Sequence, residues 1–188
     1  MKRRFNITGV CVPEQHYMAD ISGKVQKIAA LIDQGNYFVI NRPRQFGKTT
    51  TIYMLNRFLK TAGIYFPIKM SFEGIGSDSY KNEAAFTEAF LVRLKWMFEM
   101  AEQSELQAFV ETGATGVNSI AKLDIWFSKL VMKIGQPVVL MIDEVDKSCN
   151  NQLFLDFLGM LRDKYLKRVQ GEEPTFHSIV LAGVHDVK

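Results

Sequence analysis

Residues that bind metals or form disulfides are scarce in this chain. Among 188 residues there are two cysteines and three histidines. Cys11 and Cys149 belong to neither a metal-ligand spacing nor a disulfide framework, so we interpret both as reduced thiols. The histidines are equally scattered along the sequence, and a zinc site is therefore not expected.

Long apolar runs and a strong charge of either sign are also missing. The basic residues at positions 2–4 are not followed by an apolar run long enough for a signal peptide or a membrane span. We therefore expect a cytoplasmic protein without membrane association. The formal net charge is only +3. The nearest approach to a basic stripe is Lys164, Lys167 and Arg168, which we interpret as a solvated face, so nucleic acid is a weakly supported partner.

Strand-like and helix-like segments alternate along the chain. Hydrophobic residues make up 47% of the sequence, enough for one compact core at this length. The expected helices are 21–34, 48–61, 82–111 with a break near Gln103-Ser104, 119–134 and 151–169, and the expected strands are one starting at Tyr37, 65–72, 137–146 and 178–183. This alternation predicts a three-layer α/β fold with a mostly parallel sheet.

An aromatic and methionine stripe follows one side of the 82–111 stretch. Its members are Phe86, Phe90, Leu94, Met97 and Phe98. Such a stripe could form a partner surface. Helices are more often held to a core by apolar stripes of this kind, so core packing is the preferred interpretation.

The segment from Tyr37 to Thr50 contains the strongest functional signal. An apolar, β-branched and aromatic run gives way to a turn, then to Gly-Lys-Thr, and then to a helical pattern. This order is typical of a loop that binds a nucleoside triphosphate, because successive backbone N–H groups and a helix N-terminus attract phosphate. Gly47 would allow close approach, Lys48 would reach the β- and γ-phosphates, and the Thr49 hydroxyl would hold Mg²⁺.

The loop departs from the common pattern at Arg42, which stands where a glycine is usual. Pro43 restricts the backbone, so we expect a preset loop in which Arg42 and Arg44 lie near the phosphates or brace the loop. The alternative is a strand-to-helix turn with a chance Gly-Lys-Thr. The expected nucleotide contacts are Arg42, Pro43, Arg44, Gln45, Phe46, Gly47, Lys48, Thr49 and Thr50.

A second motif closes the apolar run that begins at Pro137. The run continues to Ile142 and ends in Asp143-Glu144, as in a strand buried on both faces with acids at its carboxyl end. Ligands bind at that edge of an open α/β sheet. Asp143 would accept a hydrogen bond from a metal-bound water or from Thr49, and Glu144 would polarise an attacking water. The alternative is a strand end with solvated acids.

These motifs carry a family resemblance. Residues 42–50, Ile142-Asp143-Glu144-Val145-Asp146-Lys147 and the final residues 181–188 are together similar to the bacterial predicted AAA-ATPase-like family. That family's loop reads Arg-Pro-Arg-x-Phe-Gly-Lys-Ser/Thr, so Arg42 is a family trait. The resemblance covers nearly the whole chain. It implies a P-loop ATPase of the additional-strand type, related to AAA+ and STAND proteins, with a lead-in over residues 1–36 and an ATPase core over 37–188.

The resemblance also implies where further groups would lie. The last strand would lie between the loop strand and the Asp143 strand. His185 and Asp186 would then lie near the γ-phosphate, although a surface strand end is an equal alternative. Related domains add another strand and a helical lid, so we expect a truncated fragment whose missing region belongs to the same parent chain. The role of Asp146 stays open.

Two more features of related ATPases have weaker counterparts here. Adenine would pack against the segment before the loop strand, which offers Phe5, Ile7, Val10, Tyr17 and Ile21. The preferred alternative is that these residues cover the sheet edge. Arg162 or Arg168 could serve as an arginine finger in a homo-oligomer, but a helix-surface arginine is ordinarily solvated and we expect neither to do so.

The sequence therefore supports an enzyme that hydrolyses ATP with Mg²⁺, in which Glu144 and Lys48 are the catalytic residues and Thr49 and Asp143 hold the metal. An alternative is a STAND-like switch that binds nucleotide and hydrolyses it slowly. The acid pair favours hydrolysis, because a binding module needs no carboxylate to activate water. A weaker alternative is a DNA-associated ATPase of a mobile-element or defence system.

Overall fold

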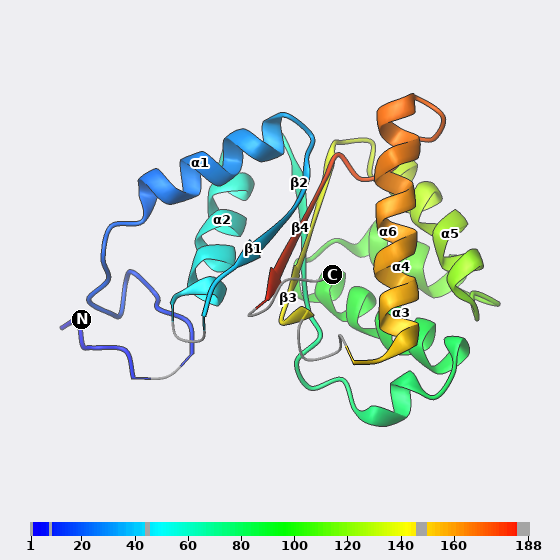
Figure 1. Cartoon of the computed structure of the whole chain (residues 1–188), viewed down its shortest axis with the longest axis horizontal. Helices are drawn as coiled ribbons and strands as arrows, with labels where there is room; N and C mark the ends of the chain where they lie inside the picture. Colours follow the sequence, from blue (N-terminus) through cyan, green and yellow to red (C-terminus); the bar gives the residue numbers. More distant parts are fainter. Residues whose placement is uncertain (1, 8, 44–45, 146–149, 184–188) are drawn as a thin grey trace.

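The computed structural model describes residues 2–7, 9–43, 46–145 and 150–183 (Figure 1). Its helices are α1 (Ser22–Asp33), α2 (Lys48–Ala62), the short 3₁₀ helix η1 (Ser77–Tyr80), α3 (Glu83–Met100), α4 (Ser104–Gly113), α5 (Ile120–Ile134) and α6 (Gln152–Gln170). Its strands are β1 (Tyr37–Asn41), β2 (Phe66–Ser71), β3 (Val138–Asp143) and β4 (Ser178–Gly183). The expected elements are therefore confirmed, with ends that differ by a few residues. Within the described residues, no helix has the length and apolar character needed to cross a bilayer.

The four strands form one parallel sheet in the order β1-β4-β3-β2. The position of β4 between β1 and β3 confirms the strand order that the resemblance implied. Every residue of β3 and of β4 is buried. Central strands of a parallel sheet are covered on both faces, which is why both segments are continuous apolar runs in the sequence.

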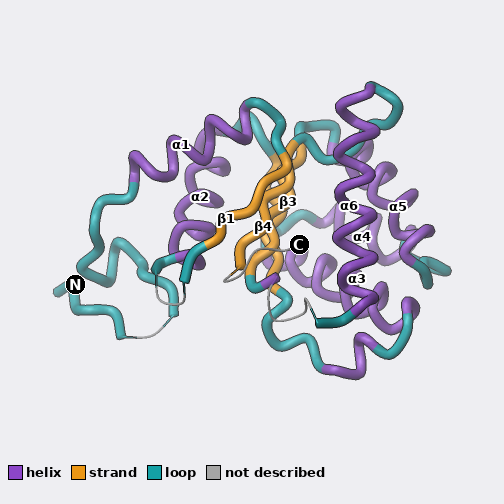
Figure 2. The backbone as a smooth tube through the Cα atoms, in the orientation of Figure 1, coloured by secondary structure: helices purple, strands orange, loops and turns teal. Residues whose placement is uncertain are grey.

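Helices cover both faces of the sheet and make the fold three-layered (Figures 1 and 2). Alternate residues of β3 point to opposite faces. Val139 and Met141 pack with α1 and α2, whereas Val138, Leu140 and Ile142 pack with α3 to α6. The α/β architecture expected from the sequence is confirmed.

The helical stretch after β2 divides where the sequence predicted a break. Helix α3 ends at Met100, Glu102 adopts a left-handed φ of 55°, and α4 begins at Ser104. A left-handed residue cannot continue a right-handed helix. The aromatic stripe of α3 is confirmed as core, since Phe86, Phe90, Leu94 and Phe98 are buried and Met97 packs against them.

The expectation of a solvated basic face on α6 is wrong for Lys164. This lysine is fully buried, because it continues the apolar stripe that contains Phe157 and Leu161. Its ammonium group lies 2.7 Å from an oxygen of Asp124 and 2.9 Å from an oxygen of Glu173. Two carboxylates compensate the loss of hydration, which is the condition under which a buried charge is tolerated.

The expectation that the lead-in segment covers the sheet edge is wrong for three of its apolar residues. Phe5 and Ile7 are 79% and 91% exposed, and Tyr17 is also exposed. Polar contacts attach this segment to α2, since the Cys11 N–H donates to the Thr50 hydroxyl at 3.0 Å and Arg57 pairs with Glu14 at 2.7 Å. Ile21 does pack against the apolar core beneath α1 and α2.

Candidate functional site

The carboxyl ends of the parallel strands meet at one edge of the sheet (Figure 1). There β1 leads into the loop of residues 42–47, and β3 ends at Asp143. The Arg42 N–H donates to the Gly183 carbonyl at 3.3 Å, so the start of the loop is attached to the end of β4. The loop and the acid-bearing strand therefore share the edge where open α/β sheets bind ligands.

Gly47 forms the junction between this loop and α2. It is the N-cap of α2 and has a left-handed φ of 71°. A Cβ atom at this position would meet no atom within 4 Å. Backbone conformation rather than crowding therefore accounts for glycine here. The first turn of α2 contains no acidic residue, so its N–H groups present uncancelled partial positive charge to the loop.

Lys48 places a buried ammonium group beneath the loop. Its Nζ donates to the carbonyl oxygens of Arg42 at 2.9 Å and Pro43 at 3.3 Å. Both acceptors are neutral, so these hydrogen bonds orient the positive charge without neutralising it. A buried cation in this situation favours an anionic ligand.

Thr49 and Asp143 bring the two motifs into contact. Asp143 is 2% exposed. Burial raises the pKa of its carboxyl group, and the Glu144 N–H, the Thr49 hydroxyl, Lys69 and Lys48 oppose that rise without cancelling it. The ionised carboxylate is therefore under-compensated and suits a cation beside it.

The donor set at this position fits Mg²⁺. A hydroxyl and a carboxylate are hard oxygen ligands, and Mg²⁺ is commonly held by one or two protein oxygens plus phosphates and waters. In the part of the chain that the structure describes, no cluster of three or more His, Cys, Asp or Glu side chains could form an all-protein metal cage. The site therefore fits a metal that arrives with a phosphate ligand.

Glu144 follows Asp143 in an unusual backbone conformation. Its φ is +60°, and its N–H donates to Asp143 Oδ1 at 3.0 Å. A left-handed conformation is strained for a residue with a side chain, and such strain clusters at functional sites. The partly exposed carboxylate of Glu144 thereby lies at the same sheet edge as the phosphate loop.

A brace behind the loop was not anticipated from the sequence. Lys24 of α1 donates to the Thr51 hydroxyl at 2.7 Å, and that hydroxyl donates to the Gly47 carbonyl at 2.8 Å. Burial lowers the pKa of Lys24, and the charge of Arg42 lowers it further. No spacing rule links a lysine on one helix to a threonine on the next, so the sequence carried no usable signal.

The remaining expected contacts fall into two groups. Arg42, Pro43 and Phe46 are exposed beside the loop, while the Thr50 hydroxyl is engaged by Cys11. The other expected site residues lie outside the described residues, namely Arg44, Gln45, Asp146, His185 and Asp186.

Comparisons with known proteins agree with this geometry. The family model of the AAA-like domain matches residues 9–186, a range that contains both motifs. A comparison with curated proteins gives no match. An AAA-like domain indicates a nucleotide-binding, ATPase-like function. The chain therefore belongs to the AAA-like domain family.

Proposed function

We propose that this domain binds ATP and hydrolyses it with Mg²⁺. The observation that carries the proposal is the position of the Thr49 hydroxyl beside the buried Asp143 carboxylate, close enough to lower the pKa of that group. It joins a phosphate-binding loop to an acid-bearing strand from a distant part of the sequence. Neither a chance Gly-Lys-Thr turn nor a solvated strand end accounts for that contact.

The proposed phosphate contacts come from the loop and from α2. The backbone N–H groups around Gly47 and the first turn of α2 would receive the phosphates. Lys48 would turn from its carbonyl acceptors toward the β- and γ-phosphate oxygens. Arg42 is exposed at the loop entrance, where its guanidinium would add a charge-assisted contact. Arg44 and His185 lie outside the described residues, and the sequence pattern alone supports them as proposed contacts.

Thr49 and Asp143 would hold the metal. Bound Mg²⁺ would neutralise charge that develops on the phosphate oxygens during transfer. The Asp143 carboxylate lies beside the Thr49 hydroxyl, and it accepts a hydrogen bond from the Glu144 N–H. The two proposed metal ligands would then need little reorganisation when the metal-nucleotide complex binds.

Glu144 is the proposed general base. Its carboxylate would orient a water toward the γ-phosphate and accept its proton. The strained backbone at Glu144 lies at the sheet edge beside the phosphate loop, and strain at such a position supports a catalytic role. This feature favours hydrolysis over a switch that only binds nucleotide.

The lead-in segment is the proposed site for the base. Phe5 and Tyr17 form an exposed ring pair with centroids 5.1 Å apart. The Cys11 contact with Thr50 places this segment beside the first turn of α2. An exposed aromatic pair next to a phosphate site would stack on a purine. Stacking alone predicts similar affinities for ATP and GTP.

Calorimetry with ATP and Mg²⁺ tests the phosphate site. Replacing Lys48 with alanine should weaken binding by about 100-fold, the size expected when a buried charge-assisted hydrogen bond is lost. The exposed Lys27 of α1 supplies the matched control, and Lys27→Ala should bind as the unaltered chain does. Equal affinity of both variants would refute the loop assignment.

Single-turnover hydrolysis tests Glu144 separately from binding. Glu144→Gln should retain ATP affinity while turnover falls by about 10²–10⁴-fold, the usual contribution of a general base. Glu88→Gln is the matched control, since Glu88 is exposed on α3. If phosphate release by Glu144→Gln matches that of the control, another group activates the water. If the unaltered chain, Glu144→Gln and Glu88→Gln all bind ATP tightly and all hydrolyse it equally slowly, the nucleotide switch would be favoured.

A further inference from the structure

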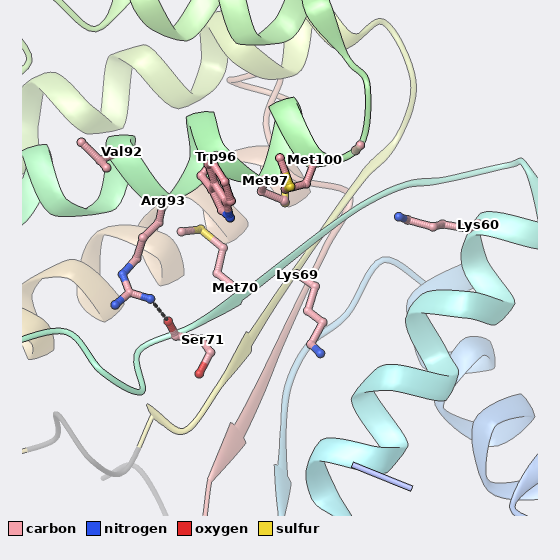
Figure 3. A pocket seen from close by; sticks show the side chains of 10 residues that line it. Lys60, Lys69, Met70, Ser71, Val92, Arg93, Trp96, Met97 and Met100 are labelled. Atoms are coloured by element: carbon pink, nitrogen blue, oxygen red, sulfur yellow. Dashed lines mark hydrogen bonds between the residues drawn. The ribbon is translucent and has the colours of Figure 1, made fainter. Parts of the chain in front are cut away.

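A second feature of the surface lies along the β2 edge of the sheet that the structure describes. Strand β2 is the last strand in the sheet order. A groove of about 750 Å³ follows its outer edge between α2 and α3 (Figure 3). We call it the β2 edge groove and define it by Met70, Trp96, Met100, Lys60 and Lys69. Its lining includes none of residues 42–47, although the charge of Lys69 also acts on Asp143.

The floor of the groove is edge-strand backbone. The N–H groups of Phe66 and Phe72 donate to Pro137 and Asp143, which fixes the side of β2 that faces β3. Along a parallel strand, the backbone N–H and C=O groups of alternate residues point to opposite sides in the plane of the sheet. The backbone groups of residues 67, 69 and 71 therefore point toward the groove. Pro67 has no N–H, and the Ser71 carbonyl accepts a hydrogen bond from Arg93 at 3.3 Å. The amide and carbonyl of Lys69 are therefore presented to an incoming chain.

The two walls of the groove differ in chemistry. On the α3 side, Val92, Trp96 and Met100 are large apolar residues with exposed fractions of 59–60%, and their spacing of four places them on one stripe. On the α2 side the groove is bordered by Lys60 and Lys69, as Figure 3 shows. A strand added to β2 would direct alternate side chains toward these two walls.

Charge selects among possible strands. The residues that line the groove include the cations Lys60, Lys69 and Arg93, and within the described part of the chain this lining contains no carboxylate. Carboxylates on the α2-facing side of an added strand would therefore meet complementary charge. Apolar side chains on its other side would cover Trp96 and Met100.

We propose that the β2 edge groove binds an extended segment of a partner protein in which apolar and acidic residues alternate. The segment extends the sheet at Lys69 through main-chain hydrogen bonds, and its alternate side chains meet the apolar and basic walls. A docked helix would cover the apolar stripe but would leave the amide and carbonyl of Lys69 without partners. Only an extended chain meets both requirements.

A second copy of this chain is a poorer occupant. When two β2 edges pair antiparallel about a twofold axis, the central Lys69 of each copy lies near that of the other. Like charges opposite one another destabilise such a pair, and Pro67 shortens the ladder further. Lysine and proline are common means of blocking self-association at a sheet edge. The same lysine attracts an acidic strand.

The test uses the full chain and short capped peptides. One peptide alternates valine with glutamate, and its control alternates valine with lysine. Trp96 is 59% exposed whereas Trp126 is 3% exposed, so a blue shift of emission on titration reports the groove. The Val-Glu peptide should give a saturable shift, and the Val-Lys peptide should give none. Amide hydrogen exchange should show that the bound peptide protects the Lys69 N–H.

Charge reversal provides the decisive variant. Lys69→Glu should weaken the Val-Glu peptide by about tenfold and should gain affinity for the Val-Lys peptide. Lys129→Glu is the matched control, because Lys129 is exposed on α5 away from the groove, and it should change neither affinity.

Four results would overturn the proposal. These are the absence of a saturable shift, equal binding of the two peptides, an unprotected Lys69 amide in the complex, and helical circular dichroism of the bound peptide. A concentration-dependent dimer of the free chain that Lys69→Glu alters would assign the groove to self-association instead.

Discussion

Replacing Lys164 with methionine tests whether buried charge, rather than apolar packing alone, stabilises this domain. The ammonium group of Lys164 lies 2.7 Å from Asp124, 2.7 Å from the Ser128 hydroxyl and 2.9 Å from Glu173. These partners lie on α5 and in the connection that precedes β4. Lys164 thus ties α6 to α5 and to the connection that leads into β4.

The expected magnitude follows from the burial of each partner. Removing one member of a buried ion pair costs about 3–5 kcal/mol when the remaining charge stays buried. Here Asp124 and Glu173 retain side-chain exposures of 24% and 22%, so water can reach the carboxylates that remain. Methionine also preserves most of the apolar contact of the lysine stem. We therefore expect a loss of about 2–3 kcal/mol, or roughly 5–10 °C in melting temperature at this chain length.

Urea unfolding at neutral pH, followed by circular dichroism, measures this loss. Lys129→Met is the control, because Lys129 is exposed on α5 and its loss should change the free energy of unfolding by less than about 0.5 kcal/mol. If Lys164→Met is as stable as the control, or more stable than the unaltered chain, the ion cluster contributes nothing net. The stabilisation would then come from apolar packing.

The pH dependence of unfolding gives an independent check. Burial raises the pKa of Glu173, but the hydrogen bonds from Ser128 and Lys164 outweigh it, so the pKa lies below the ordinary value of 4.5. A group whose pKa is lowered in the folded state stabilises the fold at pH values above its unfolded-state pKa. This stability is lost as pH falls through the folded-state pKa. The difference between Lys164→Met and the unaltered chain should therefore shrink below pH 4.5. A constant difference at all pH values would contradict this assignment.

Two further predictions concern the nucleotide site. The pKa of Asp143 is raised in the folded chain. Its contribution to stability is therefore fully present below pH 3.8, the ordinary pKa of the group, and is lost as pH rises through the folded-state pKa. At neutral pH without metal, Asp143→Asn should therefore unfold at a higher urea concentration than the unaltered chain. In calorimetry, the ATP affinity of this variant should no longer respond to Mg²⁺. A variant less stable than the unaltered chain would contradict this explanation. Thr51→Val should lose about 1–2 kcal/mol of stability and weaken ATP binding severalfold, because it removes the hydroxyl between Lys24 and the Gly47 carbonyl. If Thr51→Val binds ATP as tightly as the unaltered chain, the hydrogen bonds from Lys24 to Thr51 and from Thr51 to Gly47 serve the stability of the fold alone.

The sequence predicted those parts of the fold whose signals are local. The fully buried strands β3 and β4 correspond to apolar runs in the sequence. The end of α3 and the start of α4 lie at the helix break that the sequence predicted near Gln103-Ser104. The strand order came from the family resemblance, because no local pattern says which strands are neighbours. The proximity of Thr49 to Asp143 was anticipated from the two motifs, because both segments end at the edge where open α/β sheets bind ligands.

Other contacts could not be predicted because their partners are remote and have no characteristic spacing. Lys164 looked like part of a solvated basic helix end because Lys167 and Arg168 follow it within about one turn. The carboxylates that pair with it come from other parts of the chain. The exposed position of Phe5 was missed for the opposite reason. Apolar residues are usually covered, whereas polar contacts attach the lead-in to α2 and leave Phe5 exposed.

The residues of the candidate site share an energetic property that separates them from the rest of the core. Lys48 is a buried cation hydrogen-bonded to neutral carbonyls, the pKa of Asp143 is raised by burial, and Glu144 has a left-handed backbone. Each condition costs free energy in the folded chain, and each lies at the carboxyl edge of the sheet. Phosphate would neutralise the first and a divalent cation the second. Local rules of sequence and structure are broken at all three residues of this edge, a concentration that stability alone does not explain and that the proposed binding of a metal-nucleotide complex would explain.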